Sequence, residues 1–285
     1  MLCTFPPSLE PHLLPDAAFA GAYDALTPEE RAHIKTAIAR FIAATASCGC
    51  PEAPVARSVK TLRQGFCLHE HLRPADWAII AWDADYAGPT RILAALLPAI
   101  LAGVPAVLAC RVVAEGISSP FPPAVLAALE LAGQELVAVC SPQEALALVR
   151  ASCGMAGSGR IALLGGDESL DRLAEAAREK GAPCRRLGGT VRIGLDSSSL
   201  PPALLGAKAL RFAHPDAAFV TLPSAEEGGL SAVFCGREAV SGYMETTPLA
   251  LTPGQEACWI WPDLDAAFFQ EKARGFCPGP DDDPS

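Results

Sequence analysis

Two glycines and an aspartate stand where backbone groups can bind an anion. Gly165, Gly166 and Asp167 come directly after the apolar run RIALL and before the helical pattern ESLDRLAEAAREKG. A turn between a strand and a helix points backbone N–H groups at anions such as phosphate. The run lacks a full G-x-G-x-x-G pattern, so ordinary turn chemistry is the alternative. Gly165 and Gly166 are therefore candidate contacts for the phosphate groups of a nucleotide.

Other residue types in this part of the chain could transfer a proton. Asp83, followed by Asp85 and Tyr86, occupies the loop after the apolar run WAIIAW and can face a substrate. Two carboxylates in one loop disfavour a nearby pyrophosphate by repulsion. His214, before a Pro-Asp pair at a helix end, can act as a general acid or base, or it can be structural. We name His214 and Asp83 as candidate catalytic residues.

A group of sulfur and imidazole side chains lies earlier in the chain. Cys67, His69 and His71 alternate, so they share one face if the chain is extended there, and Cys48 and Cys50 are close in sequence. The spacing matches known zinc sites poorly. We predict no metal site, with a metal-linked or thiol-linked role for this group as the alternative.

Charge and composition exclude several classes of function. The net charge is -10 and the pI about 5.0, and no basic block offsets them, so nucleic-acid binding is not expected. No uninterrupted apolar run reaches the roughly 18 residues that a membrane span needs. The first residues do not read as a signal peptide, so we expect a cytoplasmic protein. Eleven cysteines, an odd number, are expected to be free thiols.

From Trp77 onward, apolar strand patterns alternate with helical patterns. The strand patterns are WAIIAW, PAVLAC, ELVAVC, RIALLG and TVRIGLD, with amphipathic or apolar helices between them. Such βα alternation favours a parallel sheet. We predict an α/β fold with an open, mostly parallel, doubly wound (Rossmann-like) sheet, which AAFVTL and SAVFC complete.

The regions on either side of this alternation differ from it. Thr27-Pro-Glu-Glu30 is a capping box that predicts a helix over about 27–46. The polar stretch up to about residue 74 predicts a connection with a short strand near 66–71. We divide the chain into an N-terminal helical or mixed segment (1–74), an α/β nucleotide-binding-like domain (75–245) and a C-terminal extension (246–285). The ending FCPGPDDDPS predicts a mobile acidic tail.

Two long stretches carry a family resemblance. ADWAIIAWDADYAGPTRILAALLPAILAGVPAVLAC resembles the opening of the nucleotide-binding fold of histidinol dehydrogenases, where a PA..AGV..IV.C pattern recurs. IALLGGDESLDRLAEAAREKGAPCRRLGGTVRIGLD resembles the aldehyde dehydrogenase run that leads to LELGGK. The resemblance covers roughly residues 75–222 and implies NAD or NADP as cofactor and a homodimer. It also implies that Arg111 lies near the cofactor ribose or phosphate; an exposed loop arginine that serves solubility is the alternative.

The catalytic motifs of both families are not matched. The aldehyde dehydrogenase glutamate is Arg186 here, and Phe219 to Leu222 stand where the nucleophilic cysteine is expected. In LLGAKALRFAHPDAAFVTL, the positions whose side chains bind zinc in histidinol dehydrogenases are Leu210 and Ala213. The base, the nucleophile and the zinc ligands of the families are therefore missing, and zinc is not expected.

Two functions are consistent with these residues. The first is a divergent dehydrogenase that binds NAD or NADP and oxidises an alcohol or aldehyde, with Gly165, Gly166 and Arg111 on the cofactor and His214 with Asp83 facing the substrate. The second is a non-catalytic descendant of the fold with a binding or regulatory role. Both have a small molecule as ligand. Measurable nucleotide affinity favours the first, and its absence favours the second.

Overall fold

The computed structural model describes residues 5–47, 55–117, 119–204, 208–223 and 228–278, and its body is built on a five-stranded parallel sheet. The strand order is β5-β4-β3-β6-β7, with the first strand in the middle. The chain runs outward to β5, returns to the centre and runs outward again, so the predicted doubly wound sheet is confirmed. The strands are β3 (Trp77–Asp83), β4 (Val107–Val112), β5 (Val137–Cys140), β6 (Gly159–Leu164) and β7 (Cys184–Leu187).

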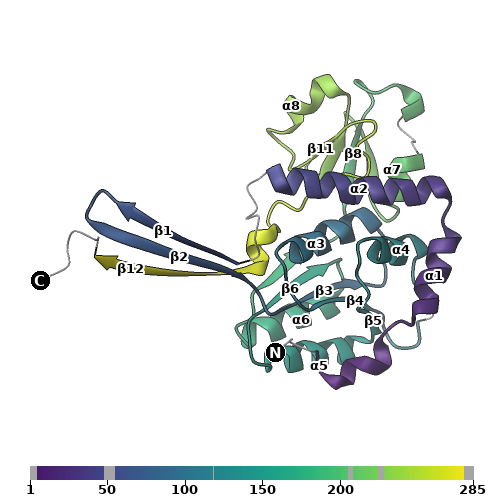
Figure 1. Ribbon diagram of the computed structural model, residues 1–285. Coiled ribbons are helices and arrows are strands. Elements are labelled where there is room, and N and C mark those ends of the chain that lie inside the picture. The colour runs from purple at the N-terminus through teal and green to yellow at the C-terminus, as the bar shows by residue number, and fades with distance from the viewer. Residues whose placement is uncertain (1–4, 48–54, 118, 205–207, 224–227, 279–285) are drawn as a thin grey trace, which may run out of the picture.

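Helices cover both faces of this sheet (Figure 1). One face carries α3 (Pro89–Leu101) and α4 (Pro123–Leu131), and the other carries α5 (Pro142–Cys153) and α6 (Glu168–Glu179). Strand β3 is buried along its whole length, as expected for a central parallel strand. Its side chains alternate between two cores, with Ile80 in the core that contains Ile92 of α3, and Ile79 in the core that contains Leu170 of α6.

The later strands form a second parallel sheet. Its order is β11-β10-β8-β9, from β8 (Arg192–Asp196), β9 (Ala218–Leu222), β10 (Ala232–Phe234) and β11 (Ala250–Leu251). The prediction that AAFVTL and SAVFC complete the first sheet is therefore wrong. Strand β7 is a half-exposed edge that ends the first sheet, and the chain leaves it through two glycines. Short helices connect the second sheet: η2 (Pro202–Leu204), α7 (Lys208–Ala213), η3 (Arg237–Ala239) and α8 (Val240–Tyr243).

Helices at the N-terminus pack across the body. They are η1 (Pro7–His12), α1 (Asp16–Ala25) and α2 (Pro28–Ser47), so the helix predicted near 27–46 is confirmed. The Glu30 N–H donates to Thr27 Oγ1 over 3.2 Å, and the Thr27 N–H donates to Glu30 Oε2 over 2.9 Å. Helix α2 lies against α3, between the two sheets (Figure 1).

Three antiparallel strands form an arm that projects from the body (Figure 1). The order is β1-β2-β12, from β1 (Ala56–Leu62), β2 (Phe66–Pro74) and β12 (Gln270–Pro278), which follows η4 (Ala266–Phe269). The predicted connection with one short strand is therefore a full hairpin. Phe276 to Pro278, predicted to belong to a mobile tail, pair with β2, and residues 279–285 lie outside the described part.

The division of the chain at residues 74 and 245 stays a prediction. Both sheets contribute side chains to one apolar core, in which Ile80 of the first sheet and Phe234 of the second belong to the same cluster. Within the described ranges, no helix is long and apolar enough to cross a lipid bilayer.

Candidate functional site

A cleft of ≈ 350 Å³ lies at the carboxyl ends of β3 and β6. The strand order reverses between these two neighbours, which is where open α/β sheets bind ligands. The walls come from the loop after β3, the turn after β6, the segment between β7 and β8, and the residues before β9. The lining residues are Asp83, Asp85, Tyr86, Gly165, Gly166, Asp167, Gly189, Thr190, Val191 and Asp216. The fold thus brings Asp83, Gly165 and Gly166 together.

The carboxylate of Asp83 fills the turn that follows β6. The N–H groups of Gly166 and Asp167 donate to its Oδ2 over 2.7 and 3.2 Å, and the N–H of Tyr86 donates to its Oδ1 over 3.0 Å. The side chain comes from the end of β3 and is largely buried. An intramolecular anion therefore occupies the position at which such a turn binds a phosphate or carboxylate ligand.

Gly165 makes this arrangement possible. Its φ is +114°, a conformation that residues with a side chain rarely adopt, and a Cβ atom there would overlap the Asp83 carboxylate. Gly166, by contrast, has no backbone conformation that requires glycine and only distant neighbours. Gly165 is therefore needed to leave room for the Asp83 carboxylate.

The ring of Tyr86 forms another wall of the cleft, and a buried cation packs against this ring. The Arg91 guanidinium lies over the Tyr86 ring, with Cζ 4.6 Å from the ring centre, and forms an ion pair with Asp216. Burial raises the pKa of Tyr86, and the nearby Arg91 acts in the opposite direction. The Tyr86 hydroxyl therefore stays protonated at neutral pH, and no described residue accepts its hydrogen bond. The hydroxyl oxygen itself is buried, so the ring and not the hydroxyl faces the cleft.

The lining of the cleft is acidic. Four aspartates line it, and no lysine or arginine does. Cations lie beside this lining and offset part of its charge: Arg91 pairs with Asp216, and Arg186 donates to Asp171 and to the carbonyl oxygens of Gly165 and Asp167. The cleft therefore favours a cationic ligand over an anionic one.

Arg111 is not an exposed loop residue, and that reading of the sequence is wrong. It lies in β4 and is 1% exposed. Its guanidinium donates to the carbonyl oxygens of Ala84, Ser119 and Pro120 over 2.8 to 3.0 Å, and to Ser119 Oγ over 2.7 Å. Burial lowers the pKa of Arg111, while Asp85 and Asp83 act to raise it. These bonds tie the loop after β3 to the loop after β4.

His214 lies away from Asp83, in the core between the sheets. The side chain is fully buried, and Nε2 donates to the Glu256 carbonyl oxygen over 2.9 Å. Its ring centre is 5.0 Å from that of Trp259. Burial lowers the pKa of His214 to about 3, and Arg91 contributes to this shift. The imidazole is therefore neutral at neutral pH, and it is not among the residues that line the cleft.

The turn after β6 does not fit the pyrophosphate of NAD or NADP. Its two N–H groups already donate to Asp83, and the aspartates around it repel negative charge. The guanidinium of Arg111 donates to three backbone carbonyls. The cofactor that the family resemblance implies therefore finds free donors neither at this turn nor at Arg111, the two places that the sequence suggested.

The cysteine and histidine group lies on the arm. Strand β2 is extended through Cys67, His69 and His71, so these side chains share a face. Cys48 and Cys50 lie outside the described residues. Among the residues that the structure describes, no group of three or more His, Cys, Asp or Glu side chains is arranged to hold a metal ion.

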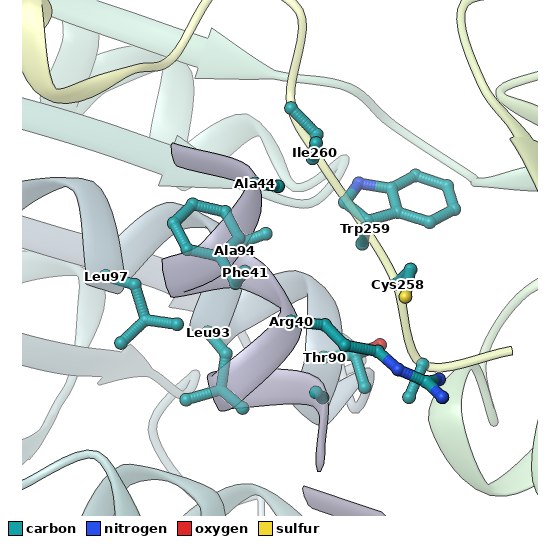
Figure 2. A pocket seen from close by; sticks show the side chains of 12 residues that line it. Arg40, Phe41, Ala44, Thr90, Leu93, Ala94, Leu97, Cys258, Trp259 and Ile260 are labelled. Atoms are coloured by element: carbon teal, nitrogen blue, oxygen red, sulfur yellow. The ribbon is translucent and has the colours of Figure 1, made fainter. Parts of the chain in front are cut away.

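A second cavity, of ≈ 60 Å³, lies between α2, α3 and residues 257–260. Figure 2 shows Phe41, Leu93 and Leu97 on one side of it and Trp259 and Ile260 on the other. Its volume is small, and its lining is mainly apolar. It therefore offers little chemistry in comparison with the acidic cleft.

Several residues of the site carry no sequence signal. Asp216 lines the cleft two positions after His214. Arg91, its ion-pair partner, lies within an apolar helix pattern, and only the second sheet brings Thr190 to the cleft. The one usable signal was the Asp83 loop, which is acidic where a phosphate site would be expected to lack negative charge.

Comparison with known proteins shows the fold. No protein-family model and no curated protein matches the chain. A crystal structure of histidinol dehydrogenase from Elizabethkingia anophelis matches with a TM-score of 0.60 at 12% identity, over 94% of this chain and 77% of that one. An aldehyde dehydrogenase from Brucella melitensis matches with a TM-score of 0.46 at 11% identity, over 92% and 87% of the two chains. A putative aldehyde dehydrogenase from Burkholderia cenocepacia gives 0.45 at 9%, over 98% and 90%. The predicted resemblance is confirmed at the level of the fold.

Proposed function

We propose that this chain is a non-catalytic descendant of the histidinol and aldehyde dehydrogenase fold that binds a small, amine-bearing molecule in the acidic cleft. The observation that carries the proposal is the Asp83 carboxylate, which accepts the N–H groups of Gly166 and Asp167. A turn whose anion position is filled by the protein has no free donor for a phosphate. The fold is thus retained, while its phosphate contact at this turn is replaced.

The chemistry of the cleft suits an ammonium group. An ammonium donates three hydrogen bonds and accepts none, so it needs the acceptors that Asp85 and Asp167 provide. Thr190, which also lines the cleft, can bind a neutral polar part of the same molecule. Because the cleft is open to solvent and the charge density is high, binding is expected to weaken with added salt.

Calorimetric titration of NAD, NADP and L-histidinol into the full chain tests this proposal. Histidinol is chosen because it carries a primary amine and because the matching fold is that of a histidinol dehydrogenase. We expect heat from histidinol and none from either dinucleotide. Asp85→Asn is expected to weaken amine binding about tenfold, the equivalent of roughly 1.4 kcal/mol. The control Glu175→Gln removes an exposed charge on α6, away from the cleft, and should leave binding unchanged.

A second variant tests the role of Asp83 directly. Asp83→Ala frees the N–H groups of Gly166 and Asp167, so it is expected to create affinity for inorganic phosphate that the natural chain lacks. If the natural chain binds phosphate or a dinucleotide as well as the variant does, Asp83 does not block the turn, and the proposal fails.

The alternative is an NAD- or NADP-dependent oxidoreductase that acts on an alcohol or aldehyde. The position of the cleft, at the reversal of strand order in a fold shared with histidinol dehydrogenase, favours it. In that case Gly165, Gly166 and Arg111 would contact the cofactor, and Asp83 and His214 would face the substrate. Micromolar dinucleotide binding together with histidinol-dependent formation of reduced nicotinamide would establish this function in place of the first.

A further inference from the structure

One face of the arm brings two cysteines and a histidine together. In the register of β2 and β12, Cys67 is directly opposite Cys277 and His69 is opposite Gly275. Alternation along the strands places the side chains of both pairs on the same face of the sheet. Because Gly275 has no side chain, the ring of His69 can lean towards β12, and its Nε2 lies 3.2 Å from Cys277 Sγ. Two thiols and an imidazole are thus adjacent.

The two cysteines can be bridged without moving the backbone. Residues directly opposite in an antiparallel pair have Cα atoms about 4.5 or 5.5 Å apart. A disulfide accepts Cα separations of roughly 4.4 to 6.8 Å. Both cysteines carry free thiols in this structure. The register therefore supplies a pair of thiols at bonding range.

The two thiols differ in solvent exposure, so they can react with an oxidant one after the other. Cys277 is exposed and in contact with His69, whereas Cys67 is buried and lies 3.5 Å from Thr61 Oγ1. A solution oxidant reaches the exposed sulfur first. The imidazole nitrogen, in contact with that sulfur, can accept the thiol proton as the sulfur attacks the oxidant. The buried sulfur is then placed to react with the product.

We propose that Cys67 and Cys277 are a peroxide-sensitive thiol pair whose disulfide fastens β12 to β2, with His69 as the positioning residue. Hydrogen peroxide is the oxidant: the Cys277 sulfur attacks one peroxide oxygen, the O–O bond breaks, and sulfenic acid and water form. The Cys67 sulfur then attacks the sulfenic sulfur; the S–S bond forms, the S–O bond breaks, and hydroxide leaves with the Cys67 proton as water. Two electrons pass from the thiols to the peroxide. The site is independent of the acidic cleft.

The chain contains a matched pair for comparison. Cys110 and Cys140 lie on neighbouring strands of the first sheet, two residues apart in register, and both are buried. Two cysteines are thus close together there without access to solvent. If proximity alone decided oxidation, this pair would react as readily as the pair on the arm.

The test exposes the full chain to hydrogen peroxide, blocks remaining thiols after unfolding, and identifies cross-linked peptides by mass spectrometry. We expect a Cys67–Cys277 link that a dithiol reductant reverses, with Cys110 and Cys140 still free. Cys67→Ser should leave a Cys277 sulfenic acid that dimedone traps. His69→Ala should slow the link several-fold, whereas His71→Ala, on the same face but one pair further along, should not. A slower amide hydrogen exchange in β12 after oxidation would confirm that the link fastens the strand.

Other results would overturn the proposal. If Cys277 links to a different cysteine, or if the arm and core pairs oxidise at the same rate, the arm is not a selective site. If the purified chain retains one zinc ion through dialysis, and removal of zinc is needed before Cys67 and Cys277 react, the group is a metal site instead. Equal rates for His69→Ala and the natural chain would remove the role of the imidazole.

Discussion

Two turns at the carboxyl ends of central strands, one in each parallel sheet, hold an aspartate in different ways. After β6, the turn N–H groups donate to Asp83, a residue from the neighbouring strand and 83 positions away from Gly166. After β8, the turn is filled by Asp196 itself, which accepts the N–H groups of Ser198 and Ser199 over 3.0 and 3.3 Å and both of their hydroxyls over 2.6 Å. One turn thus receives its carboxylate from a residue far away in the sequence, and the other from a residue of the turn itself.

The difference shows two ways in which a chain can satisfy the N–H groups of a turn that follows a parallel strand. Parallel strands leave unpaired N–H groups at their carboxyl ends, and a buried N–H without a partner is costly. The turn after β8 needs no unusual backbone conformation, because the described residues contain no non-glycine residue with positive φ. The turn after β6 needs Gly165 at φ +114° to leave room for the carboxylate of Asp83. The turn after β6 therefore depends on two strands being assembled.

The largest effect is expected from Gly165→Ala. The change combines a disfavoured φ with overlap on Asp83, so we expect a loss of about 2–5 kcal/mol in unfolding free energy. Urea unfolding followed by circular dichroism measures it. The control Gly189→Ala lies in the same cleft, has open space around it and no positive φ, and should change stability little. Similar losses for both variants would mean that the turn does not depend on the close approach of Asp83.

Replacing each aspartate with alanine should show that the two turns are stabilised differently. Asp83→Ala leaves the N–H groups of Gly166 and Asp167 without an acceptor and leaves the Tyr86 N–H only the backbone oxygen of residue 83, so it should cost about 2–3 kcal/mol. Hydrogen exchange is expected to accelerate at Tyr86, Gly166 and Asp167, on two separate loops. Asp196→Ala should accelerate exchange only within its own turn. Exchange confined to one loop in Asp83→Ala would contradict the view that this carboxylate joins two loops.

The sequence predicts the first sheet because its signals are local. Apolar strands followed by helices are legible over a few residues each, and the capping box of α2 is four residues long. The second sheet and strand β12 depend on which strand pairs with which, a long-range choice that the alternation does not encode. Likewise, the sequence places Asp83 and Gly166 in loops but not in contact. The burial of Arg111 depends on carbonyl groups, which every residue carries and no sequence pattern marks.

Acid should destabilise the folded molecule through His214. The pKa of His214 is lowered to about 3 in the folded chain, mainly by burial. Below the unfolded value of about 6.5, the unfolded chain binds a proton that the folded chain does not, so stability falls as pH falls towards 3. The slope is about 1.4 kcal/mol per pH unit, which gives a loss of about 2 kcal/mol from this group at pH 5.

His214→Gln is expected to flatten this dependence, because glutamine does not titrate and can still donate to the Glu256 carbonyl. Unfolding free energies between pH 7 and pH 4 measure the slope. His33→Gln, at a partly exposed histidine of α2, is the control and should leave the slope unchanged. An unaltered slope in His214→Gln would show that another group governs acid sensitivity in this range, and the two turns could then be compared only at neutral pH.

The smallest effect is expected from Asp196→Asn, which changes only the turn after β8. Burial acts to raise the pKa of Asp196, but hydrogen bonds from Ser198 and Ser199 outweigh it, so the pKa is lowered below 3.8. The stabilisation is complete above the unfolded value and is lost as pH falls through the lowered folded value. Measured in the His214→Gln background, the natural aspartate should lose about 1 kcal/mol below pH 3.8, and the asparagine variant should not. The control Asp24→Asn, exposed on α1, should retain the natural profile. If Asp196→Asn retains it too, the serine hydrogen bonds do not stabilise the charged form, and the local turn is held by its backbone conformation.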